Sequence, residues 1–390
     1  MIKDSFSQLR YIDGILVALV ITLSTIGLVM MSSASIDYSA QKYGNPWFHS
    51  TRQFIFLVLA MIAGFSAFMV PSQKWYQYGW ICLIAGFLLL VAVLIPGIGR
   101  EVNGSMRWIP LGPINLQSSE PAKLFVLIYL AGYLVRRQKE VRERLRGFLK
   151  PILVLFVLII LLLKEPDFGS SVVMLTACMG MIFLAGVGVK QFAALVVTSL
   201  IAVAIMATSS SYRMQRLKCF VDPWAQPYDC GYQLTQSLIA FGRGEWMGLG
   251  LGNSIQKQFY LPEAHTDFVF AIIAEETGFI GGFLTLVVFA ALIVRIFNIA
   301  RKAEAAKQLF AAYLSYGIAL LLATQVFINM GVNTGLLPTK GLTLPFLSYG
   351  GSSLIVCFIM MGILARIDAD IRSEFNASKA ENARSLRSSV

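Results

Sequence analysis

Residues 14–31 read GILVALVITLSTIGLVMM, an apolar run without a charge that follows Lys3 and Arg10. A transmembrane helix needs about 20 consecutive apolar residues, so this run predicts a first membrane-spanning helix. A signal peptide also joins a basic start to an apolar run, but its apolar core is only about 7 to 15 residues long. We therefore expect an uncleaved first span.

The rest of the chain continues this pattern. Of its 390 residues, 57% are hydrophobic and 14% are charged, whereas soluble domains carry roughly a quarter charged residues. The composition predicts an all-α polytopic integral membrane protein, formed by a single integral membrane domain over residues 1–390. Ten apolar segments are candidate spans, of which the fourth carries charges and the fifth is short: 14–34, 52–70, 76–95, 118–135, 150–164, 169–187, 191–210, 276–297, 308–330 and 346–365.

Basic residues are concentrated in alternate connecting segments, most clearly at 136–150, at 295–307 and after Arg366. Because cytoplasmic loops are enriched in Lys and Arg, this pattern predicts an even number of spans with both termini in the cytoplasm. The net charge of +11 is then explained by topology and contact with anionic lipid. It indicates no nucleic-acid partner.

The longest outward segment is a large loop over residues 211–275, between the seventh and eighth predicted helices. Leu234–Phe241 is typical of a short amphipathic helix, and a glycine-rich run over 242–252 follows, with apolar residues typical of a segment on the membrane surface. The run matches neither a Walker loop nor GxGxxG, so no nucleotide cofactor is expected. A synthetic enzyme acting outside the cytoplasm would need a donor that is activated in the lipid.

Two of the five cysteines, Cys219 and Cys230, lie in this loop. An outward compartment can be oxidising, so a local disulfide is plausible. The other three, Cys82, Cys178 and Cys357, fall in apolar spans and are expected to be core thiols. No Cys/His spacing indicates zinc.

The segment Leu261–Phe270, LPEAHTDFVF, places Asp267 beside one of the chain's two histidines. Asp267 has the chemistry of a general base, but the pattern alone favours the N-cap of a helix that begins at Phe268. His265 either pairs with a phosphate, orients Asp267, or is a hydrogen-bonded loop histidine. Glu275 and Glu276 are expected to open the eighth helix, where acids favour the positive end of the helix dipole; binding of a divalent ion is the alternative.

Glu120 and Lys123 lie three residues apart in a helix whose start is marked by Ser118 and Pro121. Ionisable groups inside a span are functional candidates, and a structural ion pair between helices is an equal alternative. The charged break over residues 164–170 is either a tight turn or a functional segment.

The segment 338–353, PTKGLTLPFLSYGGSS, is unusual for a membrane turn. Backbone amides at the start of the tenth helix, at Gly350 and Gly351 with Lys340 nearby, would suit a pyrophosphate. Interfacial Lys and Arg also contact lipid headgroups without further function. Other candidates for added positive charge are Arg107, Arg243 and Lys257.

With these motifs the chain resembles the SEDS family (shape, elongation, division and sporulation) of peptidoglycan glycosyltransferases, over essentially all ten spans. Residues 338–345 and 234–237 are more similar to the division branch than to the elongation branch. The Cys219/Cys230 pair is not part of the family pattern. The motifs that carry the resemblance are Ser119–Lys123, Glu165–Gly169, Gly231–Gln233 with Ala240–Gly244, Pro262–Phe270 and Pro338–Ser353.

The resemblance implies polymerisation of lipid II at the periplasmic face during septal wall synthesis. Asp267 matches the catalytic aspartate of the family, which reverses the preference for a helix cap, and Glu120 and Lys123 match its ion pair in the fourth helix. A divalent cation, Mg²⁺ or Mn²⁺, is implied for the pyrophosphate, with no ligands assigned. The implied partners are a class B penicillin-binding protein transpeptidase and other membrane proteins of the division complex, in the bacterial inner membrane at the septum.

Two other functions fit the sequence less well. A transporter that flips lipid II requires ionisable groups at the midplane and usually inverted repeats, and the chain shows no clear repeat. A scaffold of the division machinery requires neither a buried ion pair nor an acid in a constrained outward loop. The polymerase is therefore the favoured reading.

Overall fold

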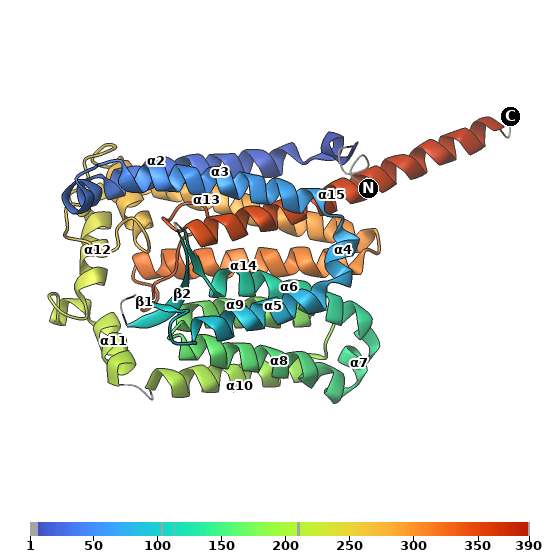
Figure 1. Cartoon of the computed structure of the whole chain (residues 1–390), viewed down its shortest axis with the longest axis horizontal. Helices are drawn as coiled ribbons and strands as arrows, with labels where there is room; N and C mark the ends of the chain where they lie inside the picture. The colour runs from blue at the N-terminus through green and yellow to red at the C-terminus, as the bar shows by residue number, and fades with distance from the viewer. Residues whose placement is uncertain (1–6, 103, 113, 209–210, 389–390) are drawn as a thin grey trace.

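The computed structural model describes the chain except for residues 1–6, 103, 113, 209–210 and 389–390. Each of the ten predicted spans coincides with a helix, and these helices run side by side in one bundle (Figure 1). They are α2 (Gly14–Tyr43), α3 (Phe48–Met69), α5 (Gly79–Val93), α6 (Ser119–Arg136), α8 (Leu145–Lys164), α9 (Phe168–Leu184), α10 (Val189–Thr208), α13 (Val269–Ala305), α14 (Leu309–Asn333) and α15 (Gly351–Ser388).

Five of these helices, α2, α3, α8, α13 and α14, are long and apolar enough within the described residues to cross a membrane by themselves. Shorter apolar helices occur at Gly79–Val93, Phe168–Leu184 and Val189–Ala202. α14 is the most enclosed of the five, with 72% of its most apolar window buried. Large apolar side chains instead face outward around the bundle, as Ile21, Ile62 and Leu153 do at 60%, 58% and 64% exposure, and in a membrane these contact lipid.

Short helices connect the spans and gather at the two ends of the bundle (Figure 1). α4 and α7 lie at one end, where α2 begins and α15 leaves the bundle, while α11, α12 and the strands lie at the opposite end. That second end is called the loop end below. The short elements are η1 (Gln8–Tyr11), α4 (Ser72–Gln77), α7 (Gln138–Glu143), α11 (Ser211–Val221), η2 (Pro223–Ala225) and α12 (Tyr232–Gly244).

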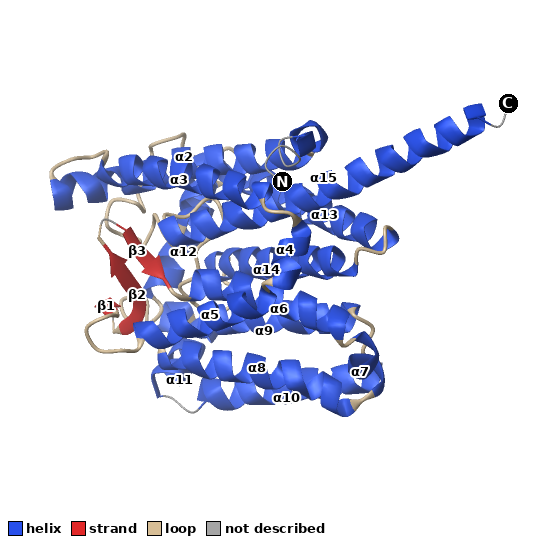
Figure 2. Cartoon of the chain, turned by 45° about the vertical axis from the view of Figure 1, so that its right-hand side comes forward, coloured by secondary structure: helices blue, strands red, loops and turns tan. Residues whose placement is uncertain are grey.

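A three-stranded antiparallel sheet at the loop end was not predicted (Figure 2). Its strands are β1 (Arg100–Val102), β2 (Ser105–Leu111) and β3 (Ile114–Gln117), in the order β1-β2-β3 with Trp108 opposite Gln117. Ser352 of α15 holds the sheet in place, since its Oγ donates to the Asn115 carbonyl at 3.0 Å and accepts from the Gln117 N–H at 3.0 Å. β2 therefore carries Arg107 into a fixed position.

α13 begins at Val269, seven residues earlier than the sequence pattern predicted, and it kinks at Gly278. Gly278 has φ +71°, and a Cβ there would lie 2.4 Å from the Gly248 nitrogen. The glycine-rich segment 245–250 fills the break: its N–H groups at Leu249 and Gly250 donate to the carbonyls of Glu275 and Glu276. The close approach explains why this loop needs glycine.

Cys219 in α11 and Cys230 are joined by a disulfide, with their Cα atoms 6.0 Å apart. We expect mass spectrometry of non-reduced peptides to find the two linked. Closing a loop of this size contributes roughly 3 kcal/mol in the chain-entropy description, so Cys219→Ser should lower the melting temperature more than Cys82→Ser, which changes an unbonded thiol. Two alkylatable loop thiols in freshly extracted protein would contradict the assignment.

Candidate functional site

Asp267 lies in a tight turn whose backbone is fixed from two sides. The N–H groups of Asp267 and Phe268 both donate to the Glu263 carbonyl, at 3.1 and 3.2 Å. The carbonyl of Asp267 accepts from the side-chain amides of Asn329, at 2.9 Å, and Asn333, at 3.0 Å, both buried on α14. The N-cap of α13 is Phe268, and the first-turn N–H of Ala271 donates to Oδ1 of Asn333 at 3.1 Å rather than to Asp267. The N-cap interpretation of Asp267 is therefore wrong, and its carboxylate is available for chemistry.

The segment 338–345 passes directly over this carboxylate. A Cβ added at Gly341 would lie 2.8 Å from Oδ2 of Asp267, so any residue larger than glycine would press against the acid. Asn329 connects the two segments, because its Nδ2 also donates to the Leu342 carbonyl at 2.5 Å. One buried amide thus sets the position of the acid relative to the segment that carries Lys340.

Asp267 as a whole residue is half-buried, and the pKa of its carboxyl group is raised to about 7. Burial is the largest cause, the negative charge of Glu263 adds to it, and the positive charge of Arg107 opposes it. A general base is most effective when its pKa is near the working pH. At neutral pH Asp267 is therefore able both to accept a proton and to release it again.

The turn between α8 and α9 brings further charged groups to this site. Arg107 of β2 donates to the carbonyls of Glu165, at 3.2 Å, and Pro166. The Asp167 carboxylate caps α9 by accepting the Ser170 N–H at 3.1 Å. Lys340 lies over the ring of Phe168, 4.5 Å from its centroid. Arg107 and Lys340 thus both meet the break at residues 164–170, which the sequence left open between a turn and a functional segment.

Glu165 within this turn is fully buried, and burial raises its pKa to about 8. The nearby Asp167 adds to this shift, while the hydroxyl of Ser118, which donates to Oε2 at 2.8 Å, opposes it. The side chain is therefore mostly protonated at neutral pH. It does not cancel the positive charges of Arg107 and Lys340.

The predicted pair of Glu120 and Lys123 is formed, with Nζ and Oε1 2.9 Å apart and both side chains at most 5% exposed. Lys123 also donates to Oε1 of Gln325 on α14 at 3.3 Å, and Nε2 of Gln325 donates to the Thr343 carbonyl at 3.0 Å. The pair therefore supports the 338–345 segment that covers Asp267. The ion pair is therefore structural, and through the 338–345 segment it also bears on the candidate site.

The sequence reading missed the polar face of α14. Gln325, Asn329 and Asn333 recur every four residues, which places them on one side of the helix, and all three are buried. Amides at this spacing inside an apolar span are a signal of a polar inner surface. They were overlooked because none of them is ionisable.

Several predicted candidates lie elsewhere. Arg243 is 3.5 Å from Glu275. The ring of His265 packs against those of Tyr38 and His49, with centroids 5.1 Å from each. Burial lowers the pKa of His265 to about 4, so it is neutral at pH 7 and supplies no charge for a phosphate.

Gly350 and Gly351 mark the start of α15 as expected, and the Gly350 carbonyl accepts the Leu354 N–H at 2.9 Å. A Cβ added at Gly350 would lie nearest Thr343 and Ser353, and one added at Gly351 would lie nearest Phe56.

Glu275 and Glu276 do not open a helix; they precede the kink of α13 and are buried. Glu276 pairs with Lys257 at 2.9 Å, and Glu275 accepts the Ile255 and Gln256 N–H groups at 3.2 Å. Their oxygens are already used to hold the 252–257 loop. Among the described residues, no three His, Cys, Asp or Glu side chains converge as metal ligands. Glu275 and Glu276 therefore do not fit the role of ligands to a resident divalent cation.

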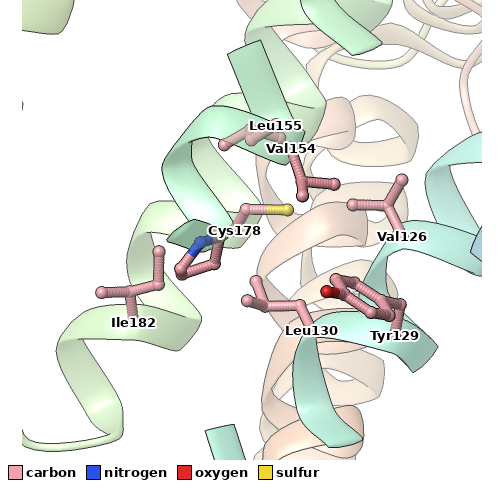
Figure 3. A pocket seen from close by; sticks show the side chains of 8 residues that line it. Val126, Tyr129, Leu130, Val154, Leu155, Cys178 and Ile182 are labelled. Atoms are coloured by element: carbon pink, nitrogen blue, oxygen red, sulfur yellow. The ribbon is translucent and has the colours of Figure 1, made fainter. Parts of the chain in front are cut away.

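A cavity inside the bundle is not part of this site (Figure 3). Its volume is about 10 Å³, barely one water molecule, and its lining is mostly apolar, with Val126, Leu130, Leu155 and Cys178 among the side chains. It is a packing gap between α6, α8 and α9.

The bundle and the buried polar groups at its loop end define a multi-span membrane protein with a candidate site at that end. A family model described as "Cell cycle protein", of the FtsW, RodA and SpoVE proteins, matches residues 14–373. The chain belongs to this family, which confirms the resemblance drawn from its motifs.

Relatives include the probable peptidoglycan glycosyltransferases FtsW of Pseudomonas fluorescens (strain SBW25), 53% identical over 93% of this chain and 89% of the relative, and of Hahella chejuensis (strain KCTC 2396), 53% identical over 93% and 92%. A chain from a structure described as "Structural coordination of polymerization and crosslinking by a peptidoglycan synthase complex" is similar with a TM-score of 0.75, 29% identity and coverage of 92% of this chain and 98% of that chain. The rod shape determining protein RodA of Thermus thermophilus gives a TM-score of 0.68 at 28% identity, covering 92% and 97%.

Proposed function

We propose that this chain is a peptidoglycan glycosyltransferase that polymerises lipid II, with Asp267 as its general base. The carrying observation is the carboxylate of Asp267, with a pKa near 7, held under a glycine and beside the turn that receives Arg107 and Lys340. The names of the FtsW relatives support the activity. The reaction needs no nucleotide, because the donor sugar is already activated by its lipid pyrophosphate.

The chemistry is a displacement at the anomeric carbon of the donor. The 4-hydroxyl oxygen of the acceptor sugar forms the new bond to this carbon as its proton passes to Asp267. The bond from the carbon to the pyrophosphate oxygen breaks, and undecaprenyl pyrophosphate leaves with the electron pair. Arg107 and Lys340 stabilise this negative charge, and Asp267 later releases its proton to water.

We expect a divalent cation to be bound by the substrate rather than held by the protein. Because Glu275 and Glu276 are already occupied, we expect Mg²⁺ or Mn²⁺ to arrive with the pyrophosphate. No step above depends on it.

We further propose that the loop end faces the periplasm and that both termini are cytoplasmic. The segment 136–150, which contains α7 and holds seven basic residues against two acidic ones, lies at the end opposite the sheet, as the enrichment of Lys and Arg on the inner side requires. A class B penicillin-binding protein transpeptidase at the division septum is the proposed partner, together with other membrane proteins of the division complex. The similarity to a member of a synthase complex that coordinates polymerization and crosslinking supports this partner.

Lys340→Ala should weaken donor use more than it lowers the melting temperature, because the ammonium group over the ring of Phe168 stabilises charge on the leaving group. We expect the rate to require a higher lipid II concentration for half-saturation. Arg107→Ala is the comparison variant, and it should also loosen the α8–α9 turn through its two carbonyl contacts. An unchanged dependence of rate on lipid II concentration in Lys340→Ala would count against a role in pyrophosphate binding.

The proposed function is tested with purified protein, alone and with its transpeptidase, incubated with labelled lipid II. Glycan chains resolved by gel electrophoresis are expected, and their formation should survive a β-lactam that blocks crosslinking. The same preparation in vesicles tests the rival transport function. Movement of lipid II between leaflets without any glycan would replace the polymerase by a flippase.

A further inference from the structure

A polar cavity of about 320 Å³ lies in the large outward loop, apart from the groups used in the mechanism. Small-molecule sites begin at roughly 300 Å³, so the cavity is in the size class of a compact polar ligand. Six polar residues contribute to its lining: Gln215, Arg216, Asp229, Tyr232, Gln233 and Thr339. Cys230 lies between them, and its disulfide to Cys219 fixes this wall against α11.

Two residues of the cavity lining belong to chain segments that lead directly to the catalytic site. Pro262 belongs to the segment that leads into Asp267, and Thr339 immediately precedes Lys340. Arg216 donates to the Thr339 carbonyl at 3.4 Å, which connects α11 to the segment that covers the carboxylate. A chain-like ligand seated in the cavity therefore lies next to the segments that hold the reacting groups.

The lining selects a class of ligand. The two glutamine amides and the tyrosine phenol offer both donors and acceptors. The positive charge of Arg216 and the negative charge of Asp229 offset each other. Nε2 of Gln215 lies 3.4 Å from Oδ2 of Asp229. A pyrophosphate would need a surplus of positive charge, and a lipid tail would need an apolar lining. Hydroxyl and acetamido groups are neutral and match donors and acceptors together.

We propose that this cavity is a binding subsite for a neutral N-acetylated sugar of the glycan strand, away from the bond being formed. The inference rests on the proposed function and deepens it. Such a subsite would hold the strand between successive additions, so that its loss shortens the products more than it slows each chemical step.

Binding is measured without catalysis, on the full chain carrying Asp267→Asn in lipid nanodiscs. The probe is a soluble, lipid-free tetrasaccharide of alternating N-acetylglucosamine and N-acetylmuramic acid, followed by saturation-transfer NMR. We expect Gln233→Leu and Asp229→Ala to weaken binding at least tenfold. Gln41→Leu, which changes an exposed glutamine of α2, is the matched control and should leave binding unchanged. Melting temperatures identify any variant that fails to fold, and Asp229 is the safer of the two because it is exposed.

In the active protein, Gln233→Leu should raise KM for lipid II and shorten the glycan products while kcat changes less. Unchanged tetrasaccharide binding in both cavity variants would overturn the subsite. The subsite would also be overturned if the two cavity variants still bound the sugar but no longer co-purified with the transpeptidase. That result would show a protein-docking surface instead. If the wild-type chain forms no glycan but binds the sugar through these residues, the proposed function fails and the subsite stands.

Discussion

Asp267→Asn is expected to lower lipid II polymerisation about a hundredfold or more and to leave the fold intact. The amide has the size of the carboxyl group but cannot accept the proton of the attacking hydroxyl. The turn does not depend on the charge, because its contacts to Glu263, Asn329 and Asn333 use the backbone of Asp267. Were this residue only a helix cap, the exchange would be nearly neutral, since Asp and Asn are about equal as caps.

Thermal stability separates the two interpretations further. The folded-state pKa of Asp267 is raised from 3.8 to about 7, so its contribution to stability is fully present below pH 4 and is lost as the pH rises through 7. An uncharged Asn avoids this loss, and Asp267→Asn should be at least as stable as the wild type at pH 8. Asp37→Asn, on α2, is the control for a charge change outside the site. A folded Asp267→Asn protein with near wild-type polymerisation would remove Asp267 from the mechanism.

Glu120→Ala and Lys123→Ala should each abolish most of the polymerisation. Removing one partner leaves the other charge buried, at a cost of about 3–5 kcal/mol when the pair is fully enclosed, and both side chains are nearly so. The loss also reaches the active site, because Lys123 holds Gln325 and Gln325 holds Thr343. We expect lower melting temperatures together with the lost activity.

A third variant distinguishes a general loss of stability from loss of the hydrogen-bonded link between Lys123 and Thr343. Gln325→Leu keeps the ion pair and cuts its link to the 338–345 segment, so activity should fall while the melting temperature falls less than in Lys123→Ala. Normal polymerisation by both single alanine variants in purified protein would refute the role of the pair.

The helical architecture could be predicted because each span is apolar over most of its length. The start of α13 could not, since Glu275 and Glu276 look like the polar beginning of a helix. Their charges are balanced by Arg243 and Lys257, which lie about 20 to 30 residues away in a loop whose path the sequence does not reveal. The sheet was not predicted because its strands are short, and because β2 contains a proline, which is uncommon within strands.

The site was predicted in part. Glu120 and Lys123 were paired by helical spacing, and Asp267 was placed in an outward loop, but its preference for base over cap came only from the family resemblance. The approach of Gly341 to the carboxylate joins segments more than 70 residues apart, and no local pattern encodes it. The same holds for Arg107, whose position depends on the unpredicted sheet.

The pH dependence of kcat/KM for lipid II polymerisation tests the central claim, that the carboxylate of Asp267 removes the proton. This profile reports the pKa of the essential base in the free enzyme, and the base acts only when deprotonated. We expect the rate to rise tenfold per pH unit at acid pH, to bend near pH 7 and then to level off. A rate that stays constant from pH 5 to pH 8.5, in protein that remains folded throughout, would contradict it.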